Sequence, residues 1–341
     1  MRKLRIVVLV REGLVPPESM EGYTEEEIAE WKAEYDVVVT LKDMGHDVRA
    51  VGVFDELAPI RRAIREHSPH IAFMMLEEFQ GVVLYDYAVV SYLELKRQPY
   101  TGCNPRGLLL SRDKALSKKI LTFHHIPTPR FMVFPKRRAA KQVRRLRFPL
   151  IVKSAIEDAS LGISQASVVH DNAALCDRVD YIHEEVGSDA LAEEYIEGRE
   201  LYVGVIGNQR LQTFPVWEMV FSGMPDDVAR IATARVKWDR EYQEKHGIVT
   251  RAADDLSAAT QARISKTCKR VYRALNMSGY ARMDLRLTAD GRLYVLEANA
   301  NPNIEYGEDF AESAEKAGIS YERLLQRIVN LGLQYRAPWK G

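Results

Sequence analysis

A hairpin pattern near the C-terminal end constrains the fold more than any other feature of this sequence. Asp290-Gly291 separates two strongly apolar, alternating runs, which is the strongest short-range signal for two antiparallel strands joined by a tight turn. If these two residues form a two-residue turn, Asp284 lies opposite Glu297, and Arg282 lies opposite Asn299. The sequence therefore predicts a β-hairpin that carries four polar side chains at defined positions.

The four polar side chains share one face of the hairpin, because residues two apart in a strand point the same way. The opposite face is apolar and contains Met283, Leu285, Leu296 and Ala298. The polar residues could form cross-strand ion pairs on a surface hairpin, but strands this apolar favour a polar face that lines a site. Two carboxylates and an amide oxygen are hard ligands, which suit Mg²⁺, with Mn²⁺ as a substitute. We therefore predict a metal site at Asp284, Glu297 and Asn299, with Arg282 beside it.

Length and charge narrow the class of protein. A chain of 341 residues favours two or three domains. Lys+Arg and Asp+Glu both total 48, which argues against nucleic acid as the main partner. A local basic run at 136–147 is interpreted as a solvated face or linker, or otherwise as an anion or partner site. No apolar run is long enough for a membrane span, so we expect a cytoplasmic protein with no membrane partner.

The first 100 residues alternate strand-like and helix-like patterns. Strands are expected at 6–10, 48–53 and 71–76, and helices from Thr24 to about Gly45 and at 58–66. The spacing of Thr24 and Glu27 predicts a capping box at the start of the first helix. Strand–helix–strand alternation predicts a parallel sheet covered on both faces.

Two further units are expected beyond this sheet. The middle unit has expected strands at 131–134, 150–153 and 164–169 and helices at 113–123 and 173–186. The last unit has expected strands at 202–206 and 212–220, helices at 256–275 and 319–331, and the hairpin between them.

Three segments of the middle of the chain could contact phosphate or nucleotide. Lys153 closes a buried strand, where a lysine on its own more often extends to solvent than to a ligand. The small-residue loop that follows, with Ser160 and Gly162, could present amide groups to a phosphate. The acidic segment 191–200 could bind adenine through the amides of an edge strand, or could be a solvated turn between domains.

Taken together and in this order, these segments resemble the ATP-grasp superfamily, and within it the D-alanine–D-alanine ligases. The resemblance covers residues 70–335 and implies a three-domain α/β architecture, in which a parallel N-terminal domain precedes two lobes that clamp ATP. The implied boundaries are 1–104 for a substrate domain, 105–192 for a central lobe and 193–341 for a lobe with the metal site. A homodimer formed through the N-terminal domain is expected from the resemblance alone.

The resemblance also implies roles for individual residues. Lys114 and Lys153 match the two nucleotide lysines, and Ser160 lies in the phosphate-covering loop. Lys237 matches a lysine that reaches the phosphates from a mobile loop, and Arg282 the arginine that stabilises the transferring group. Asp284, Glu297 and Asn299 match the metal ligands, and Glu200 the ribose carboxylate. The adenine side is matched by Glu193, Glu194, Tyr195 and Ile196.

The chain departs from the ligase pattern where amino-acid substrates would bind. The family's Gly-Gly-Thr/Ser-x-Glu segment after the first strand is absent, and Glu26 alone could replace its acid. Glu77 and Glu78 replace a His-Gly segment, and Asn303 and Glu305 lie in a sequence that replaces Ser-Pro-Gly. Acidic replacements favour an amine or another cationic group in the pocket, with simple loop variation as the alternative.

The expected activity is an ATP- and Mg²⁺-dependent ligation of a small-molecule carboxylate to an amine through an acyl phosphate, with substrates other than two D-alanines. The alternatives are an authentic D-alanine–D-alanine ligase, a non-catalytic ATP-binding protein and a kinase- or carboxylase-like enzyme of the same superfamily.

Overall fold

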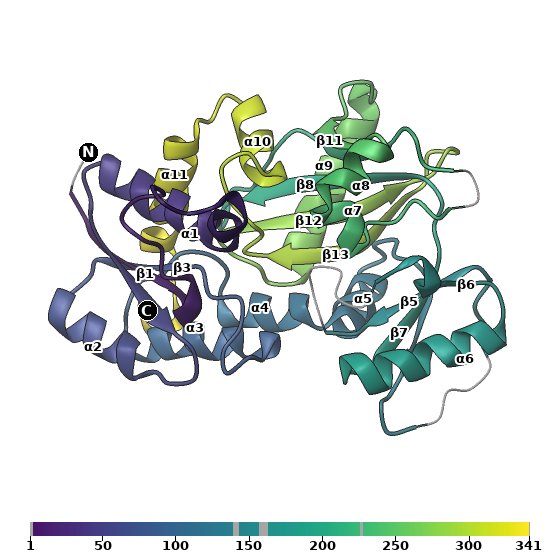
Figure 1. Cartoon of the computed structure of the whole chain (residues 1–341), viewed down its shortest axis with the longest axis horizontal. Coiled ribbons are helices and arrows are strands. Elements are labelled where there is room, and N and C mark those ends of the chain that lie inside the picture. The colour runs from purple at the N-terminus through teal and green to yellow at the C-terminus, as the bar shows by residue number, and fades with distance from the viewer. Residues whose placement is uncertain (1–2, 139–142, 157–162, 226–227, 341) are drawn as a thin grey trace.

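The first sheet forms the N-terminal part of the protein (Figure 1). The computed structural model describes residues 3–138, 143–156, 163–225 and 228–340. Strands β1 (Arg5–Arg11), β2 (Asp47–Val53) and β3 (Ile71–Met74) pair in parallel in the order β2-β1-β3, which confirms the predicted parallel sheet. Ile6 and Val8 point into one core and Val7 and Leu9 into another, so both faces are buried.

Helices cover this sheet on both faces. α1 (Glu25–Asp43) lies on one face, and α2 (Ala58–His67), α3 (Asp86–Leu95) and α4 (Pro105–Arg112) contribute to the core on the other. The predicted capping box is present, since the Thr24 hydroxyl accepts from the Glu27 amide at 3.2 Å and the Glu27 carboxylate accepts from the Thr24 amide at 2.8 Å. α3 and α4 were not predicted from the sequence.

The second sheet is antiparallel and has the order β4-β7-β5-β6. Its strands are β4 (Phe131–Phe134), β5 (Leu150–Ser154), β6 (Val168–Val169) and β7 (Ala190–Glu194), with α5 (Lys114–Phe123) before them and α6 (Asn172–Tyr181) packed against them. The strand expected at 164–169 is mostly wrong. Residues 165–167 form a 3-10 turn, in which the Ser164 amide donates to the Ser167 hydroxyl, and only two residues pair with β5.

The third sheet is the largest and holds the hairpin. Its order is β11-β10-β8-β12-β13, and β9 pairs with the end of β8. Its strands are β8 (Arg199–Ile206), β9 (Gln212–Thr213), β10 (Trp217–Phe221), β11 (Ile248–Ala252), β12 (Tyr280–Leu287) and β13 (Leu293–Ala300). The single strand expected at 212–220 is two strands, because Pro215 between them lacks the amide that a continuous ladder requires.

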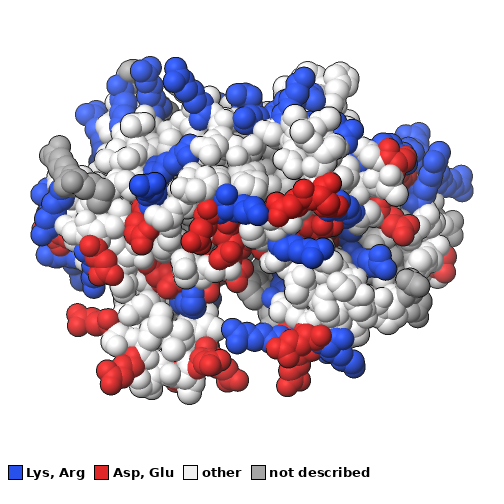
Figure 2. Space-filling model, turned by 90° about the horizontal axis from the view of Figure 1, so that it is seen from above, with Lys and Arg blue, Asp and Glu red and all other residues white. Residues whose placement is uncertain are grey.

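The C-terminal part of the chain also contains α7 (Ala234–Trp238), α8 (Arg240–Lys245), α9 (Ala258–Ala274) and α10 (Asp309–Lys316). The last helix, α11 (Tyr321–Gln334), returns to the first sheet, where Leu324 and Ile328 share a core with Ile6 and Val8. Both termini consequently lie at the same end of the molecule (Figure 1). No helix in the described ranges is both long and apolar enough to cross a membrane. Lysine, arginine and acidic side chains are interspersed over the face seen in Figure 2.

Candidate active site

The hairpin pairs as predicted at the site, although its turn is different. Asp284 lies opposite Glu297 and Arg282 opposite Asn299. The two-residue turn is wrong: β12 ends at Leu287, β13 begins at Leu293, and Gly291 has a left-handed φ of 81° in a longer loop. Nearer the site the register shifts by one residue between Asp284 and Leu285. This one-residue bulge offsets the longer turn. The predicted pairs at the site are therefore correct although the predicted turn length is wrong.

The bulge also changes which way Leu296 points. A bulge places two residues of one strand opposite one of the other, so the strict alternation of faces is lost there. Leu296, predicted on the apolar face, instead lines a pocket together with Glu297. The carbonyl of Leu296 accepts a hydrogen bond from Lys118 Nζ at 2.8 Å, which fixes the bulge to α5.

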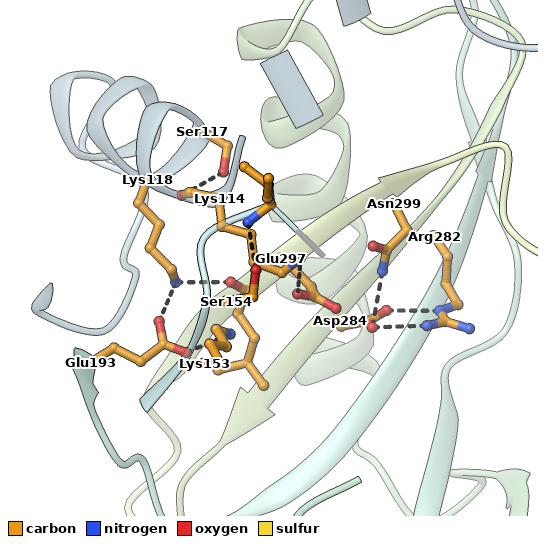
Figure 3. A network of polar contacts seen from close by, with 12 residues as sticks. Lys114, Ser117, Lys118, Lys153, Ser154, Glu193, Arg282, Asp284, Glu297 and Asn299 are labelled. Atoms are coloured by element: carbon orange, nitrogen blue, oxygen red, sulfur yellow. Dashed lines mark hydrogen bonds and ion pairs between the residues drawn. The ribbon is translucent and has the colours of Figure 1, made fainter. Parts of the chain in front are cut away.

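Arg282, Asp284 and Asn299 form one hydrogen-bonded group (Figure 3). Arg282 donates from Nε and Nη2 to the two oxygens of Asp284 at 2.8 and 2.9 Å, and Asn299 Nδ2 donates to Asp284 at 3.0 Å. Burial raises the pKa of Asp284, Arg282 opposes that rise, and the neighbouring Glu297 raises the pKa further. The guanidinium of Arg282 also lies 4.9 Å from the ring centre of Tyr202.

Glu297 lies among positive charges. Lys114 Nζ is 3.8 Å from its carboxylate. Burial alone would raise the pKa of Glu297, but Lys114, Lys153, Lys237 and Arg282 together lower it to about 2. Glu297 is therefore ionised at any physiological pH. The positively charged side chains around it outnumber the carboxylates that they face. Such an excess suits a ligand that carries several negative charges, such as a polyphosphate.

The hairpin residues fit a divalent metal ion. Asp284 and Glu297 face each other across the strands, and their negative charges repel each other. This repulsion contributes to the raised pKa of Asp284. A cation between two such carboxylates relieves that repulsion, and their oxygens with the Asn299 amide oxygen make a donor set of the kind that Mg²⁺ prefers.

A second ion network joins Glu193 to Lys118 and Lys153 (Figure 3). Glu193 is only 2% exposed, and its carboxylate oxygens lie 2.7 Å from Lys118 Nζ and 2.7 Å from Lys153 Nζ. Burial would raise the pKa of Glu193, but the two lysines outweigh it and lower the pKa. Lys118, 1% exposed, was not predicted as a site residue, although its position one helical turn after Lys114 placed it on the same side of α5.

The larger pocket lies between the second and third sheets. It is lined by all but one of the residues expected to bind nucleotide: Lys153, Glu193, Glu194, Tyr195, Ile196, Glu200 and Lys237. Two of the three predicted metal ligands, Asp284 and Glu297, also line it, whereas Lys114 and Asn299 do not. Ile151, Ile163, Ile231 and Leu296 add apolar surface. Ser160 lies outside the described residues.

The adenine-side segment is not at a sheet edge, which corrects the sequence-based interpretation. β7 lies between β4 and β5, and the amides of Glu194 and Tyr195 donate to the carbonyls of Arg130 and Pro149. These two amides are therefore already hydrogen-bonded within the protein and are not available to adenine, as they would be at the edge of a sheet. Within the described part of the chain, the Ile196 amide makes no hydrogen bond, so it is available to a ligand in the pocket.

Glu200 is paired with an arginine that sequence reasoning missed. Arg286 Nη2 donates to Glu200 at 2.6 Å, and Tyr202 donates to the other oxygen at 2.9 Å. Arg286 follows Arg282 and Asp284 at two-residue spacing in β12, so the alternation that found the hairpin face also marked this residue.

A smaller pocket lies at the carboxyl end of β3. Two of the residues expected at the substrate site, Glu77 and Asn303, line it. Glu78 instead pairs with Arg11 at 3.1 Å, and Glu305 pairs with Lys32 at 3.1 Å. Glu26 is exposed in the first turn of α1 and lines neither pocket.

Comparison with known proteins identifies the family. A family profile described as "D-ala D-ala ligase C-terminus" matches residues 120–330, which is more than half of the chain. The chain belongs to the D-alanine–D-alanine ligase family. It is thus an ATP-grasp enzyme that forms C–N bonds, an ATP-dependent carboxylate–amine ligase of the D-alanine–D-alanine ligase type acting on small molecules.

The chain is also similar to individual proteins over most of its length. An uncharacterized protein, y4sG, from Sinorhizobium fredii is 31% identical over 76% of this chain and 74% of its own length. A D-alanine–D-alanine ligase from Desulforudis audaxviator is 29% identical over 86% of this chain and 90% of its own. The crystal structure of the Bacillus anthracis D-alanine–D-alanine ligase complexed with ATP covers 97% of this ligase and 98% of its own chain, with a TM-score of 0.75 and 23% identity.

Proposed function

We propose that this ligase forms an amide or peptide bond between amino-acid-like substrates other than two D-alanines, through an acyl phosphate. One observation carries the chemistry: Lys114, Lys153, Lys237 and Arg282 surround Glu297 closely enough to lower its pKa to about 2. This arrangement supplies the positive charge that phosphoryl transfer requires, because charge on the transferring oxygens grows in the transition state.

The reaction would have two steps. A carboxylate oxygen of the first substrate attacks the γ-phosphorus of ATP, and the bond from that phosphorus to the bridging oxygen breaks, which gives an acyl phosphate and ADP. The amine of the second substrate then attacks the acyl carbon, phosphate leaves with its C–O bond electrons, and the amine proton passes to solvent. Lys153 and Lys237 would neutralise the phosphates, and Arg282 would stabilise the oxyanion of the tetrahedral intermediate.

Asp284, Glu297 and Asn299 would hold Mg²⁺, or Mn²⁺ in its place. When bound, the ion supplies charge neutralisation on the phosphates. The nucleotide would lie in the larger pocket, with Ile196 donating its amide to adenine, Leu296 beneath the base and Glu200 at the ribose. We assign Glu193 a positioning role, because both its oxygens face lysines.

Altered substrates are supported by the smaller pocket. Its lining includes Glu77 and Asn303, which stand where the ligase pattern has other residues, together with Arg112 and Tyr280. The other candidate is authentic D-alanine–D-alanine synthesis, which the activity named for the Desulforudis audaxviator relative favours.

The test is ADP release with Mg²⁺ and ATP in the presence of pooled L- and D-amino acids, with and without hydroxylamine. Hydroxylamine traps an acyl phosphate as a hydroxamate, so the donor is detected even when its natural acceptor is missing. We expect amino-acid-dependent ADP and a hydroxamate, with D-alanine alone giving little of either. Efficient turnover of D-alanine alone would reject the altered substrate, and absence of any hydroxamate and of any ADP would reject the proposed activity.

A further inference from the structure

The segment 229–233, which leads into α7, is held by side chains from two different sheets. Gln165, in the 3-10 turn before β6, bonds both backbone groups of Ala229. Its Nε2 donates to the Ala229 carbonyl at 3.0 Å, and its Oε1 accepts from the Ala229 amide at 3.1 Å. From β12 of the third sheet, Arg286 Nη2 donates to the carbonyl of Arg230 at 2.6 Å. Two adjacent residues of one segment are thus fixed from both sides.

This segment forms part of the wall of the larger pocket. Ile231 and Ala232 line the pocket, and Ile163, two residues before Gln165, lines it as well. Ile231 is buried. The two hydrogen bonds of Gln165 therefore join the second-sheet and third-sheet parts of the protein beside the pocket in which we place the nucleotide.

The segment also sets where α7 begins. Thr233 is the N-cap of α7, since its hydroxyl accepts from the Val236 amide at 3.2 Å. The Lys237 amide donates to the Thr233 carbonyl at 3.0 Å, so Lys237 lies about one helical turn, or about 6 Å, beyond the end of the segment. Val236 packs in the core beside β10, which holds α7 along its length. Lys237 is consequently placed by the backbone on both counts.

The ammonium group of Lys237 has no partner that would fix it directly. In the ranges that the structure describes, no carboxylate lies within ion-pair distance of Lys237 Nζ. Its charge nevertheless reaches the hairpin face: burial raises the pKa values of Asp284 and Glu297, and Lys237 is among the cations that oppose this rise. Because a lysine side chain is long and flexible, the position of its backbone decides what the ammonium group can reach.

We propose that Gln165 is a positioning residue for phosphoryl transfer, which holds Ala229 and thereby keeps Lys237 within reach of the transferred phosphate. This inference rests on the proposed ligase function and adds to it a residue outside the pocket lining. A side-chain amide suits the role, because it offers a donor and an acceptor side by side, as a paired strand would. Small displacements of a group that acts on the reacting atoms are costly to the rate, so a contact remote from the phosphates can matter.

The first test replaces Gln165 by methionine, which has a similar length and no amide. Gln209→Met is the matched control, since Gln209 is exposed in the turn between β8 and β9 and does not line the larger pocket. We expect Gln165→Met to lower kcat for amino-acid-dependent ADP release at least about fivefold, because two hydrogen bonds are lost at an exposed position. The KM of the amino acid and the unfolding midpoint should change little. A kcat equal to that of Gln209→Met would overturn the proposal.

A double-mutant cycle asks whether Gln165 acts through Lys237. In the Lys237→Met background the lysine is gone, so its position no longer matters. Adding Gln165→Met should then lower kcat by less than about twofold. An equal loss of kcat in both backgrounds would reject the link between the two residues.

A third measurement needs no turnover. Dissociation constants are compared for a non-hydrolysable ATP analogue with Mg²⁺ and for adenosine, which has no phosphates. We expect Gln165→Met to weaken binding of the analogue at least about fivefold, to leave adenosine unchanged, and to affect neither in the Lys237→Met background. An equal loss for the analogue and for adenosine would mean that Gln165 supports the pocket wall instead of Lys237, which would overturn the proposal.

The binding data also separate this proposal from the ligase function. If no amino acid gives ADP but the affinity for the analogue depends on Gln165 only when Lys237 is present, the ligase proposal fails and the positioning role stands. If amino-acid-dependent ADP is formed equally well by wild type and Gln165→Met, the ligase proposal stands and the positioning role fails.

Discussion

At the scale of single residues, two buried carboxylates of the site are each held by groups that donate hydrogen bonds or carry positive charge. Glu193 lies between two lysines, and Asp284 is held by both the guanidinium of Arg282 and the amide of Asn299. Breaking such a group leaves an uncompensated charge, which is more damaging than the loss of one hydrogen bond. Glu297 differs, because several cations surround it with few carboxylates to match them.

Removing a charge from the hairpin face should therefore impair the chemistry. We expect Glu297→Ala and Arg282→Ala each to lower kcat at least about 100-fold, because an electrostatic contact to a developing charge typically contributes about 3–4 kcal/mol to transition-state stabilisation. Initial rates of ADP release measure the effect. Circular dichroism and binding of an ATP analogue serve as controls for the fold, and near-native turnover by either variant would contradict these roles.

Glu34, a buried carboxylate on α1, should make stability depend on pH. Burial raises its folded pKa to about 7, above the unfolded value of 4.5, so the folded state binds more protons across that interval. The free energy of unfolding then falls as pH rises from 4.5 to 7, by up to about 3 kcal/mol from this residue, and is constant above. We expect Glu34→Gln to gain stability relative to wild type between pH 5 and pH 8 in urea titrations. A parallel pH dependence of the two proteins would refute the raised pKa.

At the scale of elements, the sequence predicted strands and helices well where one periodicity dominates. The first sheet and the long helices follow from apolar spacing alone. The bulge in β13 could not be predicted, because it depends on Lys118 binding the Leu296 carbonyl from another sheet's helix. The central place of β7 depends on sheet order, which local sequence does not encode. The burial of Glu34 was detectable from its position on the apolar stripe of α1, but the pocket that it lines was not.

The contact between α5 and the bulge gives a prediction at this scale. Lys118 donates to Leu296 and Thr128 and pairs with Glu193, so Lys118→Met leaves a buried carboxylate with one lysine instead of two. We expect the free energy of unfolding to fall by about 3 kcal/mol or more, measured by urea titration. The exposed neighbour gives the control Lys119→Met, which should change stability by less than about 0.5 kcal/mol. Equal stability of the two variants would argue against this contact as a structural support.

At the scale of the whole molecule, the two ends of the chain share one core. α11, which the sequence assigns to the unit at 193–341, packs with α1 on the first sheet rather than with the hairpin alone. The smaller pocket draws on both: Ala33 and Glu34 come from α1, and residues 301–304 come from the segment that leads toward α10 and α11. Packing at the C-terminal end should therefore set the rigidity of the proposed substrate pocket.

A pair of matched cavity mutations tests this coupling. Leu325 on α11 and Leu175 on α6 are both fully buried, but in the cores of the first and second sheets respectively. Each Leu→Ala change removes the same atoms and should cost about 2–5 kcal/mol locally. We expect Leu325→Ala to raise hydrogen–deuterium exchange in β1 and β3, more than 240 residues earlier in the chain, and to leave β5 and β7 protected. Leu175→Ala should do the reverse. If both variants raised exchange uniformly, the molecule would open as a single cooperative unit, and the pocket at α1 would depend on the second sheet as much as on α11.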